Sequence, residues 1–288
     1  MRLCRFDQHR LGVVLGDSVA DVSAVLDTLP SLRWPLPAGD QLIANLARLR
    51  PLIEQTLEHA PRRALADCHL DSPVANPTKI IGAPVNYQKH IDEARADRQI
   101  NVGNDVRTID YYGLFLKANS SLVGQASGVT LPFADRRHDH EGELAVIIGR
   151  ECRGIIAAQA LDHVAGYSVA LDMTVRGSED RSFRKSPDTY SVLGPWLVTR
   201  DEIADPGDLE LWLQVNGVDR QRTNTRHLIY DVPQLIEYAA AQYTLYPGDI
   251  IMTGTPEGVG PVVPGDVIEA GIGGIGALRV TVSGQNKR

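Results

Sequence analysis

The stretch HDHEGELAVIIG, residues 138–149, decides how the rest of the chain is interpreted. It begins with charged residues and continues as an apolar run that predicts a β-strand. Glu141 and Glu143 are two residues apart, and side chains at this spacing project from the same face of a strand. Two adjacent carboxylates repel each other, and a divalent cation would remove that repulsion. Because every donor is an oxygen, the pair favours Mg²⁺, Mn²⁺ or Ca²⁺ over Zn²⁺.

The other polar residues of this stretch are less suited to hold an ion. Strand alternation places His138 and His140 on the face opposite the glutamates, so we expect both histidines to be structural or to face solvent. Asp139 shares the glutamate face but is nearer the preceding turn, and we rank it below the glutamates as a ligand. The alternative for Glu-x-Glu standing alone is an edge strand with a solvated acidic face.

A third acidic candidate ends a later apolar strand. Residues 166–171, GYSVAL, predict a buried strand, and Asp172 follows directly as a further oxygen donor. Arg176 and Lys185 come shortly afterwards and add positive charge to the same region. The alternative is that Asp172 caps a following helix and that Lys185 belongs to a plain turn.

A histidine and a glutamate occur together in NYQKHIDE, residues 86–93. His90 and Glu93 are three residues apart and would share one face of a helix. A carboxylate beside an imidazole fixes its tautomer and raises its basicity, as a general base requires. The alternative is an ordinary charge pair on a surface helix. The polar segment Arg95–Gly113 that follows is too long for a simple connection, and we expect it to form a lid.

Composition excludes several classes of function. The chain has 288 residues and a formal net charge of −7, so it carries no basic footprint for nucleic acid. No apolar run approaches the length of a membrane span, and the N-terminus lacks a signal-peptide core. The three cysteines have no CxxC spacing and favour a reducing cytosol over a disulfide framework. We therefore expect a cytoplasmic protein that acts on a small molecule.

The chain order predicts an α+β fold that is rich in strands. Residues 1–75 resemble a small α/β domain, with short strands, a helix at 21–29 and helical periodicity over 40–59 that Pro51 interrupts. The Pro- and Asn-rich stretch 71–79 is the expected linker, and residues 76–288 form the larger domain. That domain is dominated by strands, with a hairpin at Asn216-Gly217 and a helix at 232–243.

One apparent motif is rejected. Residues 271–276 match GxGxxG, but a dinucleotide fingerprint requires a strand before it, a helix after it and an acidic residue about 20 positions later. The sequence after residue 276, ALRVTVS, predicts a strand instead. We therefore expect no dinucleotide site.

Taken together, these stretches resemble the fumarylacetoacetate hydrolase family. The resemblance runs in the family's order from about residue 79 to the C-terminus, and the N-terminal region resembles the variable small domain of bacterial members. The matching stretches are NYQKHIDE (86–93), FLKANSSLVG (115–124), DHEGELAVIIG (139–149), GYSVALDMTVRG (166–177), KSPDTYSVLGPWLV (185–198) and YPGDIIMTGTPEGVG (246–260).

The resemblance implies a mixed β-roll, a homodimer and a metal centre for Mg²⁺ or Mn²⁺. Its roles would be carried by eight residues. The metal ligands would be Glu141, Glu143 and Asp172, the water-activating dyad His90 and Glu93, and the substrate contacts Arg176, Lys185 and Thr255.

The implied reaction is hydrolysis of a C–C bond in a 2,4-diketo acid, such as an acylpyruvate, a fumarylpyruvate or a diketo-deoxy sugar acid. The cation would stabilise the enolate that departs, and Lys185 would stabilise the oxyanion. Decarboxylation of an oxaloacetate-type acid and isomerisation of 2-hydroxyhepta-2,4-diene-1,7-dioate are alternatives within the family. Gly177 replaces the aspartate that is common after Arg176, and Glu179 stands where some hydrolases of the family have a substrate-binding glutamine. These departures leave the metal site intact and bear on the choice of substrate.

Overall fold

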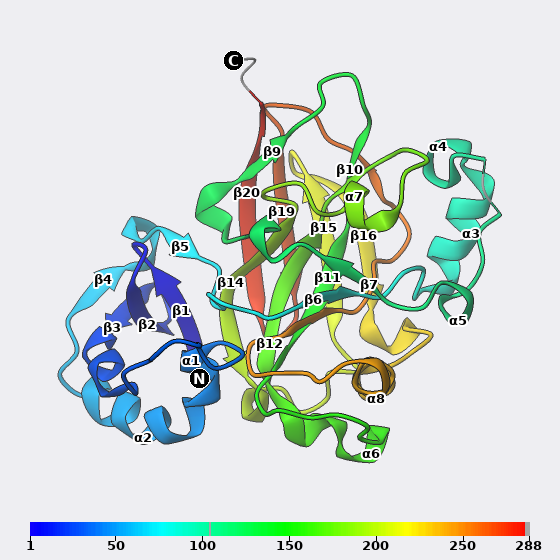
Figure 1. The fold of residues 1–288 in the computed structure, drawn as a ribbon. Coiled ribbons are helices and arrows are strands. Elements are labelled where there is room, and N and C mark those ends of the chain that lie inside the picture. Colours follow the sequence, from blue (N-terminus) through cyan, green and yellow to red (C-terminus); the bar gives the residue numbers. More distant parts are fainter. Residues whose placement is uncertain (104, 286–288) are drawn as a thin grey trace.

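The computed structural model describes residues 1–103 and 105–285. Its central sheet runs in the order β4-β3-β2-β1-β14-β12-β11-β17-β6-β7, with β5 paired to β1 and β8 paired to β14 (Figure 1). The bounds of these strands are β1 Arg2–Phe6, β2 Arg10–Leu15, β3 Ser18–Asp21, β4 Arg62–Ala64, β5 Leu70–Asp71, β6 Ile80–Gly82, β7 Phe115–Lys117, β8 Leu122–Val123, β11 Gly142–Ile148, β12 Val164–Asp172, β14 Ser191–Thr199 and β17 Ile250–Met252. The fold is therefore α+β and rich in strands, as predicted.

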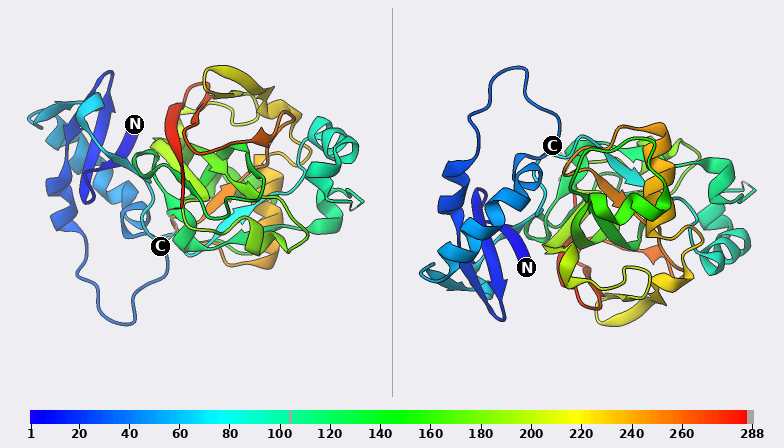
Figure 2. Two further views of the ribbon diagram at one scale, coloured as in Figure 1. Left: turned by 90° about the horizontal axis from the view of Figure 1, so that it is seen from above. Right: turned by 90° about the horizontal axis from the view of Figure 1, so that it is seen from below.

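The N-terminal region lies at one side of the molecule (Figure 2). It contains α1 (Gln41–Ala44), α2 (Leu46–Leu57) and a 3-10 turn, Ser23–Thr28, where we predicted a helix. Its strand β1 pairs with β14, Leu3 lying opposite Leu197, so the central sheet continues into this region. A domain boundary near residue 75 stays a prediction.

The predicted break of the first helical segment at Pro51 is wrong. The chain breaks at Asn45, between α1 and α2, and Pro51 lies inside α2. Pro51 is the sixth residue of α2, so only one backbone hydrogen bond, to the carbonyl of the first turn, is lost. Packing of Leu49 and Ile53 in the buried core holds the helix together on either side of the proline.

Two smaller sheets cover the central sheet. One has the order β16-β15-β19-β20-β9 and the other β13-β10-β18. Their strands are β9 Val129–Leu131, β10 His138–His140, β13 Thr174–Val175, β15 Glu210–Val215, β16 Val218–Asn224, β18 Gly260–Pro261, β19 Val267–Ile272 and β20 Gly276–Gly284. Asn216 and Gly217 both have positive φ and form the predicted hairpin turn. The GxGxxG match is the turn between β19 and β20, and a strand follows it, as expected.

The remaining helices are short, apart from α8. Their bounds are α3 Gln88–Ala96, α4 Arg98–Asn101, α5 Ile109–Tyr112, α6 Ala157–Ala160, α7 Arg181–Arg184 and α8 Val232–Gln242. Asp231 and Gln234 form a capping box at the start of α8, which explains why the predicted helix begins there. Helices α3, α4 and α5 gather at the edge of the molecule away from the N-terminal region (Figure 1). Within the described residues, no helix combines the length and apolarity needed to cross a membrane.

Candidate active site

Three buried carboxylates meet at the ends of β11 and β12. Glu143 lies on β11 opposite Ala170 of β12, and Asp172 is two residues further along the same face. Glu141 immediately precedes β11, and its carbonyl accepts the backbone N–H of Asp172. One carboxylate oxygen of each residue lies within 4.8 Å of the others. The predicted convergence of the three residues is therefore present, and we refer to them as the acidic triad.

The two alternatives for the acidic triad, a solvated edge strand for the glutamates and a helix cap for Asp172, are wrong. Strand β11 lies inside the sheet, between β12 and β17, and the side chains of Glu141, Glu143 and Asp172 are buried. Asp172 caps no helix, because the chain continues into β13. Burial of three acids without a cation would be costly, so the site requires positive charge nearby.

Two lysines supply part of that positive charge. Lys185 Nζ lies 2.6 Å from both Glu141 Oε2 and Asp172 Oδ2. Lys117 Nζ forms an ion pair with the other oxygen of Asp172 and donates to the carbonyl of Tyr190 at 2.8 Å. Sequence reasoning found Lys185 but missed Lys117, whose only signal was a lysine within an apolar strand. Burial lowers the pKa of Lys117, and Asp172 opposes that effect.

Glu143 is the triad member that best supports a metal site. Its Oε2 accepts the backbone N–H of Gly254 at 2.7 Å, yet it forms no ion pair with any described residue. Burial, with Asp172 and Glu141 adding to it, raises the pKa of Glu143 well above its usual range. By contrast, Lys185 and Arg176 outweigh burial and lower the pKa of Glu141 to about 2. A buried all-oxygen set with one uncompensated carboxylate fits a hard divalent cation such as Mg²⁺, Mn²⁺ or Ca²⁺.

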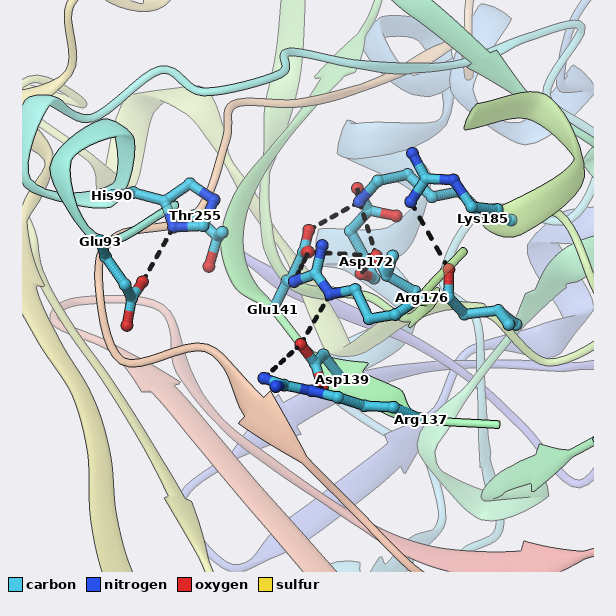
Figure 3. A network of polar contacts seen from close by, with 12 residues as sticks. His90, Glu93, Arg137, Asp139, Glu141, Asp172, Arg176, Lys185 and Thr255 are labelled. Atoms are coloured by element: carbon cyan, nitrogen blue, oxygen red, sulfur yellow. Dashed lines mark hydrogen bonds and ion pairs between the residues drawn. The ribbon is translucent and has the colours of Figure 1, made fainter. Parts of the chain in front are cut away.

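Arg176 connects the triad to a second acidic residue. Its Nη2 lies 3.2 Å from Glu141 Oε1, and its Nε lies 2.7 Å from Asp139 Oδ2. Asp139 is fully buried and also pairs with Arg137, at 2.7 Å (Figure 3). Two guanidinium groups therefore occupy the oxygens of Asp139, and its lower rank as a metal ligand stays a prediction. Arg176 lines the cavity beside the triad, and its contact with substrate stays a prediction.

The two histidines of the opening stretch are structural. Both are buried, so the possibility that they face solvent is wrong. The Nε2 of His138 lies 2.6 Å from the carbonyl of Phe133, and its Nδ1 faces the hydroxyl of Tyr190. Burial lowers the pKa of both histidines, that of His140 to about 4, which keeps them neutral near neutral pH.

The predicted dyad is formed on α3. His90 Nδ1 lies 3.1 Å from Glu93 Oε2, and the other oxygen of Glu93 accepts the N–H of Gly258 at 2.9 Å. His90 is buried and lines the same cavity as the acidic triad, so an ordinary surface pair is excluded (Figure 3). Glu93 can thus orient the imidazole while the Gly258 amide holds Glu93.

His90 of the dyad and the triad line one cavity of about 490 Å³. This volume lies within the range of roughly 300–1,000 Å³ that small-molecule sites occupy. The predicted lid, residues 95–113, forms one wall and contains α4 and α5 instead of irregular chain throughout; Asn104 lies outside the described residues. Sequence reasoning missed Arg181 and Arg184 of α7, which line the cavity beside Lys185.

Thr255 also lines the cavity, but its hydroxyl is engaged by the protein. The Oγ1 donates to the carbonyl of Gly142 at 3.1 Å and accepts from Gln221 at 2.7 Å. These bonds fix Thr255 against β11, next to the acidic triad. A role in binding a substrate carboxylate stays a prediction.

The two departures from the family pattern lie together. Arg136 forms a two-point ion pair with Glu179, at 2.9 and 2.8 Å, and also donates to the carbonyl of Arg176. Gly177 makes room for this pair, because a Cβ there would lie 2.0 Å from Arg136 Nη2 and 2.2 Å from Glu179 Oε2. The charge of Glu179 is therefore directed at Arg136.

Comparison with known proteins agrees with this geometry. A family model described as "Fumarylacetoacetate (FAA) hydrolase C-terminal" matches residues 79–283. The chain belongs to the fumarylacetoacetate hydrolase family. Together with the site, membership confirms the prediction of a hydrolase with a place for a divalent metal.

Named members of the fumarylacetoacetate hydrolase family resemble nearly the whole chain. A maleylpyruvate hydrolase of Aquipseudomonas alcaligenes is 54% identical over 284 residues, 98% of this chain and 99% of the relative. A 2,4-didehydro-3-deoxy-L-rhamnonate hydrolase of Sphingomonas sp. (strain SKA58) is 36% identical over 98% of this chain and 96% of the relative. The crystal structure of a maleylpyruvate hydrolase from Sphingobium sp. SYK-6, in complex with manganese(II) and pyruvate, is 43% identical with a TM-score of 0.84, covering 99% and 100% of the two chains.

Proposed function

We propose that this protein hydrolyses an acylpyruvate, a 2,4-diketo acid, at the bond between its acyl carbonyl carbon and the adjacent methylene carbon. The products are pyruvate and a carboxylic acid. The observation that carries the proposal is that His90, which is hydrogen-bonded to Glu93, lines the same cavity as the buried acidic triad. A general base beside a metal centre is the combination that hydrolysis needs. The similarity to maleylpyruvate hydrolases supports this class of substrate.

The dyad would activate water. Because Nδ1 of His90 donates to Glu93, Nε2 is the nitrogen that remains to accept a proton from water. The resulting hydroxide attacks the carbonyl carbon of the acyl group, and the bond between that carbon and the pyruvate methylene breaks. The electron pair passes to the pyruvate part, and the proton on His90 returns to the methylene carbon. Water and substrate are thereby converted into one carboxylic acid and pyruvate.

The acidic triad and its cations would hold the α-keto acid end of the substrate. A divalent cation bound by Glu141, Glu143 and Asp172 would act as a Lewis acid that stabilises negative charge on substrate oxygens. Lys185 presents a buried positive charge at the same point, and Arg176 adds a second. We propose Mn²⁺ or Mg²⁺ as the native ion; the manganese complex of the similar Sphingobium enzyme supports Mn²⁺.

A substrate screen tests the proposal. The protein, stripped of metal and reloaded with Mn²⁺ or Mg²⁺, is assayed with maleylpyruvate, acetylpyruvate and oxaloacetate. We expect acylpyruvate cleavage to yield pyruvate and the free acid in equal amounts, and to require the added ion. Faster release of CO₂ from oxaloacetate than cleavage of any acylpyruvate would identify a decarboxylase and overturn the proposal.

A further inference from the structure

Most charged groups around the cavity already have a partner of opposite charge. Lys185 and Arg176 are paired with the triad and Asp139, and Arg107 of the lid lies 2.7 Å from Asp105. Glu179 is paired with Arg136. Asp180 caps α7 by accepting from the N–H and hydroxyl of Ser182. The exceptions among the cations are both on α7.

Arg184 is held in place without a carboxylate partner. Its Nε donates to the backbone carbonyl of Glu179 at 2.7 Å, and the contact of its Nη1 with the carbonyl of Val175 is long, at 3.5 Å. Among the residues that the structure describes, no aspartate or glutamate forms an ion pair with Arg184. The guanidinium is thus held mainly at Nε. Its Nη1 makes only the long contact and its Nη2 makes no hydrogen bond within the described residues, so both can turn toward a ligand.

Arg181 is a second cation of the same helix that forms no ion pair with any residue the structure describes. It stacks on the ring of Tyr112, 4.0 Å from its centre, and lies one turn before Arg184. Like charges at this spacing repel, and burial, with Arg176 and Arg181 nearby, lowers the pKa of Arg184. An anion between the two arginines would relieve this repulsion.

We propose that Arg184, assisted by Arg181, binds a second carboxylate at the acyl end of the substrate, so that the enzyme selects acylpyruvates that are dicarboxylates. This inference rests on the proposed function, which assigns the α-keto acid end to the triad. Lys185 directly follows Arg184 in the chain, and both residues line the cavity that contains the triad. A guanidinium forms paired hydrogen bonds with a carboxylate, which supports selection by shape as well as charge.

The first test measures binding without turnover. Two α-keto acids that carry no second carbonyl to attack, 2-oxoheptanedioate and 2-oxoheptanoate, differ mainly in the distal carboxylate. With Mn²⁺ present, the native protein should bind the dioate about 10- to 100-fold more tightly by calorimetry. Arg184→Gln should remove most of that preference, Arg184→Lys should restore part of it, and binding of the monoacid should change little. Arg200→Gln is the matched control, because Arg200 pairs with Asp162 at the surface and lies outside the cavity.

The second test compares two substrates in turnover. Arg184→Gln should lower the ratio of kcat/KM for maleylpyruvate to kcat/KM for acetylpyruvate by about 10- to 100-fold, mainly through KM. An unchanged ratio would overturn the inference. If kcat/KM fell equally for both substrates, Arg184 would only support the structure around α7.

Failure of the two proposals can be told apart. If the native protein cleaves neither acylpyruvate, the proposed function fails. The comparison of 2-oxoheptanedioate with 2-oxoheptanoate in binding still decides whether Arg184 selects a dicarboxylate. If the native protein cleaves both substrates and binds the dioate and the monoacid equally, the hydrolase proposal stands and the inference is wrong.

Discussion

The acidic triad and the dyad face one cavity but are supported in different ways. The triad lies on internal strands of the central sheet, whose alternate residues pack into the two largest buried clusters of the molecule. The dyad lies on α3, which shares a small separate cluster with the lid, formed by Ile91, Ala94, Ile100, Val106 and Val259. The difference indicates that the proposed metal site is built into the sheet, whereas the proposed water activation would depend on a segment at the edge of the fold.

This division has a thermodynamic consequence. Segments with few buried contacts open at a lower free energy than the core of the same protein. We therefore expect the α3–α5 segment to open and close over substrate while the acidic triad keeps its arrangement. Substitutions should separate the two halves of the site, and the following predictions run from the largest expected effect to the smallest.

Removal of Glu143 should abolish the metal-binding half. Glu143→Ala takes away the triad carboxylate that has no protein cation, so we expect stoichiometric Mn²⁺ binding and all metal-dependent cleavage to be lost. Calorimetry with Mn²⁺ measures the first effect directly. Glu151→Ala, an exposed change, is the matched control. Unchanged Mn²⁺ affinity in Glu143→Ala would refute the metal assignment.

Removal of His90 should abolish water activation and leave metal binding by the acidic triad intact. We expect His90→Ala to reduce acylpyruvate cleavage by about 10²–10⁴-fold, the usual contribution of a general base. The affinity for Mn²⁺ should stay within a few-fold of that of the native protein, because His90 is not a member of the triad. Glu93→Gln should have a milder effect in the same direction, since an amide still orients the ring. Retained cleavage in His90→Ala would exclude water activation by this residue.

Closure of the lid should be visible by hydrogen exchange. Backbone amides of residues 95–103 and 105–113 should exchange more slowly, by up to about tenfold, once oxalate and Mn²⁺ are added together. Residues 46–57 in α2 provide the internal control, because they lie in the N-terminal region. Equal exchange of the segment with and without oxalate would mean that it does not act as a lid.

An ion pair of the N-terminal region should contribute slightly to stability and should not affect the active site. Arg50 of α2 forms a two-point ion pair with Asp201, at 3.0 and 2.7 Å, and both side chains are exposed. We expect Arg50→Gln to lower the free energy of unfolding by about 0.5 kcal/mol near pH 7, as measured by urea denaturation. Arg33→Gln, an exposed change in the N-terminal region, is the control.

The effect of Arg50→Gln should also depend on pH. The hydrogen bond from Arg50 holds the pKa of Asp201 below its ordinary value of 3.8, so the folded state binds the proton less readily than the unfolded chain. The pair therefore contributes stability above about pH 4, and that contribution is lost as the pH falls toward the lowered pKa. A difference between variant and native protein that grows in acid would contradict this.

The sequence was sufficient where a role depends on local spacing. Glu141 and Glu143 have the spacing of strand alternation, and His90 and Glu93 have the spacing of one helical turn. Both pairs could therefore be predicted without knowledge of the tertiary structure. The positions of Lys117 and Arg184 could not. Lys117 meets Asp172 although β11, β17 and β6 stand between β7 and β12 in the sheet order, so the contact depends on how the whole molecule folds. The availability of Arg184 depends on where every acidic neighbour is directed.

Other features also depend on the assembled molecule. His138 and His140 are buried on β10, the middle strand of the sheet β13-β10-β18, and no local pattern encodes this placement. Pro51 is tolerated because tertiary packing outweighs one lost hydrogen bond. The homodimer and the domain boundary near residue 75 stay predictions.

The contact of Gly177 with Arg136 and Glu179 also limits how this sequence can change over time. A side chain at position 177 would meet both partners at once, so the aspartate that is common in the family would require the flexible ends of Arg136 and Glu179 to move. Replacing Glu179 alone would leave Arg136 without its carboxylate beside the Arg176 carbonyl. The three positions are therefore coupled: the effect of a substitution at one of them should depend on which residues stand at the other two.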